Sequence, residues 1–433
     1  MVNTSNKVAQ EKLALFGGPK TIQTEFKRYN PIGIEEVTAA KKVIEGGVLS
    51  QFIGAWHADF YGGPKVKEFE RHCAEYFGVK HAVTVNSWTS GLVAAVGAIE
   101  IEPGDEIIVT PWTMSASATA ILHWNAIPVF ADIDAETFNL DPKSVEANIT
   151  PYTKAIMVAD IFGQSADIDE LMTIATKYGL KVISDTAQAP GALYKGKYAG
   201  TSAHVGGYSL NYHKHIHTGE GGILVTNDDE IAERLHLIRN HAEVVVGDKG
   251  VTNLANMIGH NFRLGEVECA MGIEQLKKLD GFVKTRQGLA NRLSEGLKGL
   301  CGLRTPVVRP DRTHVYYVYP LILDIEELGV GRDQIHAALQ AEGVAVSKLY
   351  QNIHLLPMYQ KKMAYGSRGF PWSSDICHRD VSYSKGICPV AEELNDSTYL
   401  GFGMCVYDLT DEDVQLIVRA FKKVWNNLDS LKA

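Results

Sequence analysis

The chain has 433 residues, of which 45% are hydrophobic, and its formal net charge is −9. This length predicts at least two domains, and the negative charge excludes a basic face for nucleic acid. Six cysteines are scattered without paired spacing, which indicates reduced thiols in a cytoplasmic protein. The first residues lack the apolar core of a signal peptide, and no apolar run approaches the roughly 20 residues of a membrane span. We therefore expect a cytoplasmic protein with no membrane partner.

The beginning of the chain shows three kinds of segment. Residues 1–30 are expected to form a loosely held N-terminal arm, and residues 35–45 have the spacing of a helix. Residues 48–63 are rich in aromatic residues and glycine, and their composition fits a binding loop as well as a packed loop. Pro64 then opens an amphipathic helix that is expected to end near Tyr76.

From residue 81 onward, short apolar runs alternate with helical segments. This alternation is typical of an α/β fold whose mostly parallel sheet is covered by helices on both faces. Residues 31–290 are therefore expected to form a large domain around a seven-stranded sheet. The predicted strands span residues 81–85, 106–110, 127–132, 155–162, 181–185, 205–210 and 223–226.

The rest of the chain has the pattern of a smaller α+β domain, expected over residues 291–433. Helices are predicted at 264–279 and at 280–300, and the second of these would lead out of the large domain. The C-terminal part contains predicted strands at 316–323 and 344–347, a helix at 332–340 and a last amphipathic helix at 410–428.

The strongest chemical signal lies in residues 205–227. An apolar strand runs into a polar turn with one lysine, Lys214, and a Gly-Glu-Gly-Gly turn at 219–222 leads into the next strand. Such a lysine can attack a carbonyl if burial among other cations lowers its pKa. An exposed hairpin lysine would fit the same pattern.

A second signal is the strand at 181–185, which ends in Asp185. Open α/β sheets place their ligand crevice at the carboxyl ends of strands. Asp185 followed downstream by Lys214 fits a pyridoxal phosphate site, in which the lysine binds the cofactor covalently and the carboxylate keeps the pyridine nitrogen protonated. A helix N-cap is the alternative role for Asp185.

Three further positions fit the same cofactor. Ser87 and Thr89 lie between a strand and a helix, where a phosphate finds hydroxyl and amide donors, although ordinary capping would use the same residues. Ser209 precedes the lysine turn and is a further candidate for the phosphate. Either Trp112 or Met114 is a candidate to stack on the cofactor ring, with core packing as the alternative.

Three alternating histidines, His213, His215 and His217, surround the lysine. On a strand they would share one face, as metal ligands can, but only Glu220 offers a further ligand. We expect no metal site and interpret these histidines as support for Lys214 and its cofactor.

Together, these motifs resemble the DegT-type (DegT/DnrJ/StrS) sugar aminotransferases, which are fold-type I pyridoxal phosphate enzymes. The resemblance covers approximately residues 30–425. The Lys214 segment, the Ser-Asp-Thr-Ala-Gln segment that contains Asp185, and Gly-His-Asn-Phe-Arg at 259–263 are similar to family motifs and occur in the same order.

The resemblance implies a role for each matching residue. Lys214 would bind the cofactor covalently and Asp185 would pair with its pyridine nitrogen. Ser209 would contact the phosphate, and Gln188 would lie against the ring hydroxyl. Asn261 would reach the phosphate of the neighbouring subunit, which implies a homodimer with shared active sites.

Two positions depart from the family pattern. Trp88 stands where a glycine is usual in the phosphate turn, but the donors of this turn are its backbone, Ser87 and Thr89, so we expect Trp88 to leave it intact. The aromatic residue that usually stacks on the cofactor aligns with Met114.

The resulting hypothesis is an aminotransferase that moves an amino group from glutamate or glutamine to a keto sugar, expected to be nucleotide-linked. Alternatives are an aminotransferase for a free keto-cyclitol or another unlinked keto compound, a pyridoxal phosphate-dependent sugar dehydratase, in which histidine replaces the lysine, and a silent scaffold. Candidate contacts to the substrate are Trp56, His57, Lys348, Tyr350 and His354.

Overall fold

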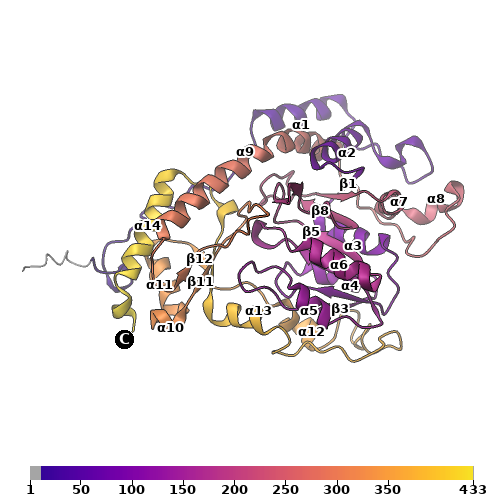
Figure 1. Cartoon of the computed structure of the whole chain (residues 1–433). Helices are drawn as coiled ribbons and strands as arrows, with labels where there is room; N and C mark the ends of the chain where they lie inside the picture. The colour runs from indigo at the N-terminus through magenta and orange to yellow at the C-terminus, as the bar shows by residue number, and fades with distance from the viewer. Residues whose placement is uncertain (1–10, 433) are drawn as a thin grey trace, which may run out of the picture.

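The computed structural model describes residues 11–432 and is built around a seven-stranded sheet (Figure 1). The strand order is β1-β9-β8-β5-β4-β2-β3, and only β9 runs antiparallel to its neighbours. The prediction of a mostly parallel, seven-stranded sheet is confirmed. The strands are β1 (His81–Val85), β2 (Glu106–Val109), β3 (Ile127–Phe130), β4 (Thr153–Ala159), β5 (Lys181–Asp185), β8 (Val205–Ser209) and β9 (Gly222–Thr226).

Helices cover both faces of this sheet. Strand β9 shows the two faces, because Leu224 packs in one apolar cluster while Ile223 and Val225 pack in another. A strand buried on both faces is apolar throughout, which explains why the strands read as continuous apolar runs. The helices of the large unit are α1 (Ile34–Gly46), α2 (Pro64–Phe77), α3 (Trp88–Ala98), α4 (Ala116–His123), α5 (Pro142–Ala147), α6 (Ile168–Tyr178), α7 (Asp229–Arg239) and α8 (Ala242–Lys249). A small hairpin, β6 (Leu193–Tyr194) with β7 (Lys197–Tyr198), follows β5.

A second, antiparallel sheet forms the centre of the smaller unit. Its strand order is β10-β11-β13-β12, and its strands are β10 (Leu303–Arg304), β11 (Tyr319–Leu323), β12 (Val346–Ser347) and β13 (Tyr399–Phe402). The helices α10 (Ile325–Leu328), α11 (Arg332–Glu342) and α14 (Asp411–Trp425) surround it. No helix within residues 11–432 is long and apolar enough to cross a membrane.

A single helix of 32 residues, α9 (Glu266–Leu297), joins the two units. It runs from α1 and α2 at one end to α14 at the other (Figure 1). The prediction of two helices that meet near residue 280 is wrong, because buried residues recur at helical spacing across this point, from Leu276 and Leu279 to Val283.

The N-terminal arm is held firmly over residues 11–30, against the expectation of a loose segment. Leu13 and Ile22 are buried in the apolar cluster of the smaller unit. The buried carboxylate of Glu342 accepts hydrogen bonds from the amides of Ala14 (2.7 Å) and Thr21 (3.0 Å). This anchor lies more than 320 residues away in the sequence, so no local pattern reveals it. Residues 1–10 of the predicted arm lie outside the described residues.

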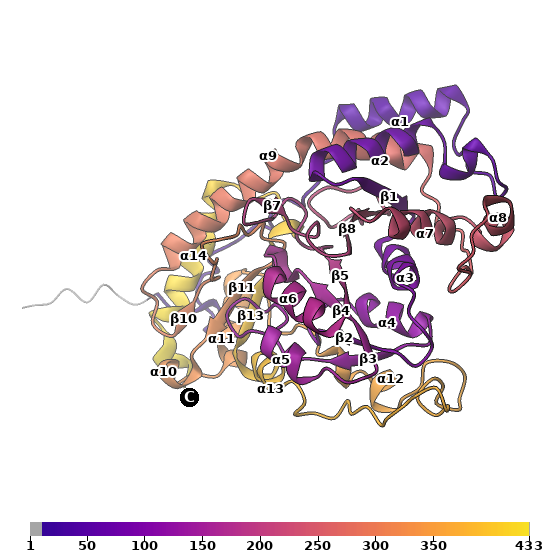
Figure 2. The same ribbon diagram turned by 45° about the vertical axis from the view of Figure 1, so that its right-hand side comes forward.

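The segment over 353–394 returns to the large unit and lies along the edge strand β3 (Figure 2). It contains α12 (Pro357–Gln360) and α13 (Pro389–Glu393). The hydroxyl of Tyr383 donates to the carbonyl of Pro128 in β3 (2.8 Å). The guanidinium of Arg379 binds both carboxylate oxygens of Glu106 in β2, at 2.6 and 3.1 Å. We retain 31–290 and 291–433 as the proposed domains, with this segment packed on the larger one.

Candidate active site

The predicted cofactor residues gather at one edge of the large sheet. Asp185 is the last residue of β5 and Ser209 is the last residue of β8, while Ser87 follows β1 by two residues. Because β1, β5 and β8 run in the same direction, their carboxyl ends meet at this edge. The structure therefore brings together three motifs that lie far apart in the sequence.

Lys214 lies in a closed turn between β8 and β9. The amide of Leu210 donates to Gly221 (2.9 Å), and the amide of Thr218 donates to Leu210 (3.1 Å). Gly221 has a φ of +149°, which a residue with a side chain rarely adopts. These bonds fix the turn, so the position of Lys214 is set by backbone geometry.

The amine of Lys214 is buried against an aromatic ring. The side chain is buried, its Nζ lies 4.4 Å from the ring centre of Tyr317, and within residues 11–432 Nζ makes neither a hydrogen bond nor an ion pair. Burial lowers the pKa of Lys214 to about 8, and the negative charge of Asp185 opposes this shift. The sequence-based expectation of neighbouring cations as a cause is wrong, because loss of hydration is sufficient. A buried amine with a lowered pKa and no partner fits covalent attachment to a carbonyl.

Asp185 is held by donors on both oxygens. Oδ1 accepts from the indole Nε1 of Trp88 (2.6 Å) and from the amide of Ala187 (3.2 Å), and Oδ2 accepts from the hydroxyl of Ser117 (2.7 Å). No helix begins directly after Asp185, so the N-cap alternative is excluded. This buried carboxylate is suited to pair with a protonated pyridine nitrogen.

The turn after β1 offers donors for a phosphate. Ser87 caps α3, and its hydroxyl oxygen accepts from the amide of Ser90 (3.0 Å). The amides of Trp88 and Thr89 have no acceptor within the described chain, as is usual for the first turn of a helix. Since the indole of Trp88 is directed to Asp185, it does not obstruct this turn. The residues present thus fit an anion at this helix end.

Gln188 connects the two units beside Asp185. Its Oε1 accepts from the amide of Phe162 (2.9 Å), and its Nε2 donates to the hydroxyl of Tyr350 (3.0 Å). Burial raises the pKa of Tyr350 to about 12, so the phenol stays neutral and can both donate and accept. Of the candidate substrate contacts, Tyr350 is the one that the structure places in contact with a predicted cofactor residue.

Met114 and Trp112 have different environments. Trp112 is fully buried, donates to Asn352 (2.7 Å) and lies parallel to Phe138, so the core alternative is correct for this residue. Met114 is 60% exposed, and its carbonyl accepts from the amide of Ser117 (3.2 Å), whose hydroxyl contacts Asp185. Met114 is therefore the residue of the two that is free to cover a ring bound at Asp185.

The three histidines do not share a face, because they lie in a turn and not in a strand. His215 is fully buried, its Nε2 bonds the carbonyl of Val315 (2.8 Å), and burial lowers its pKa well below the usual range. His217 accepts from the amide of Gly219 (3.2 Å), while burial and Lys214 lower the pKa of His213 to about 4. Residues 11–432 contain no group of three or more side chains arranged to hold a metal ion.

Two candidate substrate residues lie in the loop over 48–63. Trp56 packs against Tyr61 and under the amine of Lys249, which lies 4.9 Å from its ring centre. The ring Nδ1 of His57 accepts from the amide of Asp59 (3.1 Å) at the start of a 3₁₀ turn. Neither residue contacts Lys214 or Asp185 within this chain, so their predicted role stays a prediction.

Two further candidates belong to the smaller unit. His354 is fully buried, its Nε2 lies 2.9 Å from Glu392 Oε1, and its predicted contact with the substrate stays a prediction. The amine of Lys348 forms an ion pair with Asp333 (3.0 Å) and makes no contact with Lys214. A substrate would have to displace this ion pair to bind Lys348.

Asn261 lies beside the phosphate turn and is exposed. Its side-chain oxygen accepts from Arg263 Nε (2.8 Å), and its carbonyl accepts from the side chain of Asn86 (3.2 Å). Its predicted reach into a neighbouring subunit stays a prediction.

Ser117 and Tyr317 contact Asp185 and Lys214, although no motif in the sequence identifies them. Ser117 lies in α4, 68 residues before its partner Asp185, and Tyr317 lies about 100 residues after Lys214. The position of Ser117 shortly after the end of β2 was a usable signal, because helices that follow such strands begin at the ligand edge.

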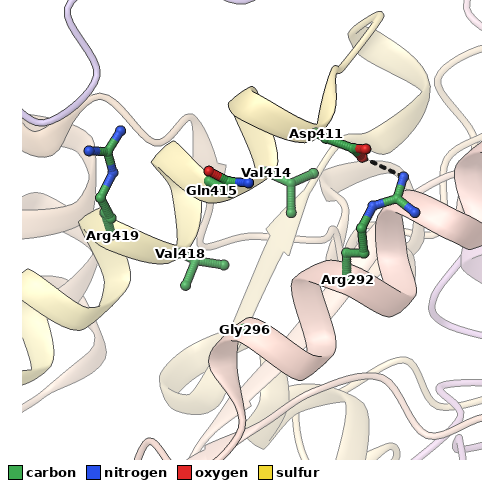
Figure 3. A pocket seen from close by; sticks show the side chains of 7 residues that line it. All are labelled: Arg292, Gly296, Asp411, Val414, Gln415, Val418 and Arg419. Carbon is green, nitrogen blue, oxygen red and sulfur yellow. Dashed lines mark ion pairs between the residues drawn. The ribbon is translucent and has the colours of Figure 1, made fainter.

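A separate groove of about 450 Å³ lies between α9 and α14 (Figure 3). An ion pair between Arg292 and Asp411 (2.6 Å) crosses one side of the groove, and the side chain of Arg419 points away from this ion pair. Its seven lining residues all belong to α9 or α14, and none of them is a predicted cofactor or substrate residue. The groove is therefore distinct from the site at the strand ends.

Comparison with known proteins agrees with this site. Residues 54–396 match the model of the DegT/DnrJ/EryC1/StrS aminotransferase family. The chain is 37% identical to the GDP-perosamine synthase of Caulobacter vibrioides, over 69% of this chain and 79% of that protein. It is 32% identical to the L-glutamine:scyllo-inosose aminotransferase of Streptomyces griseus, over 96% of this chain and 98% of that protein.

The fold is also shared with solved structures. The aminotransferase from Psychrobacter cryohalolentis superposes with a TM-score of 0.80 at 26% identity, over 94% of this chain and all of that one. The chain therefore belongs to the DegT/DnrJ/EryC1/StrS aminotransferase family and is a pyridoxal phosphate-dependent aminotransferase of fold type I.

Proposed function

We propose that this enzyme transfers an amino group from glutamate or glutamine to the keto group of a polyhydroxylated ring, with Lys214 and Asp185 as its central residues. The observation that carries this proposal is the buried, unpartnered amine of Lys214 beside the strand edge that ends in Asp185. Bound pyridoxal phosphate supplies a carbonyl for the amine and a ring that accepts electrons.

Each residue of the site has a defined task. Lys214 binds the cofactor and, once an amino donor has displaced it, takes a proton from one carbon and delivers it to another. A pKa of about 8 suits this work, because the amine can both accept and release a proton near neutral pH. The Asp185 carboxylate would accept a hydrogen bond from the ring nitrogen.

The remaining residues position the cofactor. The amides of Trp88 and Thr89, with the hydroxyls of Ser87 and Ser209, would hold its phosphate. Gln188 would meet the ring hydroxyl, since its amide already reaches another hydroxyl, that of Tyr350. Met114 would cover one face of the ring.

Two classes of acceptor are compatible with this site. A nucleotide-linked keto sugar is the first, supported by the likeness to the GDP-perosamine synthase. A free keto-cyclitol is the second, and a specific observation favours it. The likeness to the scyllo-inosose aminotransferase extends over 96% of this chain and 98% of that protein, and so includes nearly all of both chains.

We further propose a homodimer in which Asn261 completes the partner's phosphate site. Apolar side chains near Asn261 and Lys214 support a subunit contact, since Ile258 and Tyr212 are each 67% exposed. A mixture of Lys214→Ala and Asn261→Ala chains tests this arrangement. Hybrid dimers regain one intact site if Asn261 acts across the interface, and they stay inactive if it acts within its own chain.

We also propose that the protein works in the cytoplasm. Its six cysteines are all free thiols, and Cys73, Cys269, Cys388 and Cys405 are buried. Six unpaired thiols are typical of a reducing compartment. Detection of a disulfide in protein isolated from cells under thiol-blocking conditions would contradict this location.

The proposed function is tested by measuring its two stages separately: transfer of the amino group from the donor to the cofactor, and from the cofactor to the acceptor. The loaded enzyme is mixed with L-glutamine or L-glutamate, and loss of the visible band of the covalently bound cofactor reports amino transfer. The aminated enzyme, freed of donor, is then offered a nucleotide-linked keto sugar or a free keto-cyclitol. Return of the band with one acceptor identifies its class. No response to either donor would overturn the proposed function.

A further inference from the structure

The carboxylate of Asp185 accepts hydrogen bonds from two buried side chains. Trp88 donates from Nε1 to Oδ1 at 2.6 Å, and Ser117 donates to Oδ2 at 2.7 Å. Both contacts are buried, with Trp88 6% and Asp185 6% exposed. Hydrogen bonds from buried neutral donors to a carboxylate are strong and directional.

The backbone is shaped to admit the indole. A Cβ atom on Gly207 of β8 would overlap the Trp88 ring, and one on Gly91 would lie 2.8 Å from it. Glycine at these two positions therefore leaves the space that the ring fills. This arrangement explains how a tryptophan can follow Ser87 without disturbing the phosphate turn.

The two donors differ in their chemistry. An indole N–H can donate but cannot accept, so Oδ1 must remain an acceptor whether or not a ligand is bound. The hydroxyl of Ser117 can do both, and it also lies 2.7 Å from the hydroxyl of Thr113. Trp88 is thus the donor that fixes the position of Oδ1.

The number of unused lone pairs indicates which oxygen of Asp185 can accept a hydrogen bond from the cofactor. A carboxylate offers about four acceptor positions, two on each oxygen. Both positions on Oδ1 are used, by Trp88 and by the amide of Ala187, whereas Oδ2 has only Ser117. Oδ2 therefore keeps one position for a further donor.

We propose that Trp88 and Ser117 are positioning residues that hold the carboxylate of Asp185 oriented, so that Oδ2 accepts the hydrogen bond of the cofactor's ring nitrogen. This inference rests on the role proposed above for Asp185. Its consequence is that the indole N–H, which acts only through Asp185, controls the protonation of a ring nitrogen that it never touches.

The test uses the protein loaded with ¹⁵N-labelled pyridoxal phosphate, whose ring-nitrogen chemical shift reports protonation directly. Trp88→Phe removes the N–H and keeps a large ring, and Ser117→Ala removes the other donor. The matched control is Trp124→Phe, because Trp124 is also buried, also lies against a glycine, and donates to the carbonyl of Val93 (2.7 Å).

We expect a protonated ring nitrogen in the wild type and in Trp124→Phe. In Trp88→Phe and Ser117→Ala the shift should move toward the neutral form, and the Kd for the cofactor should rise about tenfold or more. Shifts in both variants that match the control would overturn the proposal. If Trp88→Phe fails to fold, Ser117→Ala decides by the same criterion.

A parallel measurement on Asp185→Asn separates this inference from the function on which it rests. A neutral ring nitrogen in the wild type, or no change in Asp185→Asn, would refute the role of Asp185 itself. A response to Asp185→Asn without a response to Trp88→Phe or Ser117→Ala would refute only the positioning residues.

Discussion

The amine of Lys214 lies over the face of Tyr317, 4.4 Å from the centre of the ring. An aromatic face attracts the charged form of an amine, whereas an apolar surrounding disfavours it. Burial is the larger of these effects, because the pKa of Lys214 is lowered to about 8. Tyr317 belongs to the segment between α9 and β11, so the reactive amine of the large unit is covered from the C-terminal part of the chain.

The pH dependence of cofactor attachment should follow this pKa. Attachment needs the neutral amine, so its rate should rise with pH up to about 8 and then level off. Stopped-flow absorbance after mixing the apoprotein with pyridoxal phosphate measures this rate. A lysine analogue in solution, with a pKa of about 10.4, is the control. A protein rate that still rises steeply above pH 9 would contradict the lowered pKa.

Substitution of Tyr317 should move this profile in a direction set by hydration. Tyr317→Ala admits water to Lys214, and since burial dominates, the midpoint should shift above 8 and the rate at pH 7 should fall. Tyr317→Phe keeps the ring and should keep the midpoint. Equal profiles for the alanine and phenylalanine variants would show that the ring does not shield the amine.

Burial of Lys214 should also destabilise the apoprotein. A pKa lowered from 10.5 to about 8 means that the folded chain binds fewer protons than the unfolded chain between these pH values, so stability rises with pH across this window. Below pH 8 the full destabilisation of the folded apoprotein by the buried charge of Lys214 is present. Lys214→Met should therefore stabilise the apoprotein at pH 7 by roughly 1–3 kcal/mol.

Urea unfolding of both apoproteins at pH 7 and pH 10 measures this cost. The advantage of the methionine variant should be largest at pH 7 and should shrink by pH 10. An advantage that does not change with pH would mean that packing, and not the charge of Lys214, is responsible.

The segment over 353–394 should depend on Arg379 for its attachment to the sheet. Glu106 is 2% exposed, and Arg379 binds both of its oxygens. Arg379→Met leaves this carboxylate without its cation and should lower the free energy of unfolding by about 1–3 kcal/mol. Asp380→Asn, which removes an exposed ion pair with Lys362 in the same segment, is the matched control and should leave the unfolding midpoint unchanged.

Limited proteolysis provides a second measure of this attachment. The segment should be cleaved faster in Arg379→Met than in Asp380→Asn. Equal rates and equal midpoints would contradict an anchoring role for Arg379.

Local sequence patterns were sufficient to predict the large sheet and the central residues of the candidate active site. Strands buried on both faces are rich in apolar residues, so most strands of the large sheet are visible in the sequence. Asp185, at the end of β5, and Lys214, after β8, are placed by these strands. Gly219 and Gly221 identify the lysine turn because both have a positive φ, which favours glycine.

Contacts between distant segments could not be predicted in this way. The direction of the Trp88 indole depends on space beside Gly207, more than 100 residues later. His354 is of a residue type that often binds ligands, but in the structure it is buried and lies beside Glu392. The arm over 11–30 looks weakly held in the sequence because its anchor, Glu342, belongs to α11.

The most direct test of the account is to locate the bound cofactor on the chain. The loaded protein is reduced with borohydride, which makes a covalent link to an amine permanent, and its peptides are then analysed by mass spectrometry. We predict that the added mass lies on Lys214 alone and that Lys214→Ala carries none. Modification of another lysine, or a reduced wild-type protein without any added mass, would contradict the assignment of Lys214 as the catalytic amine.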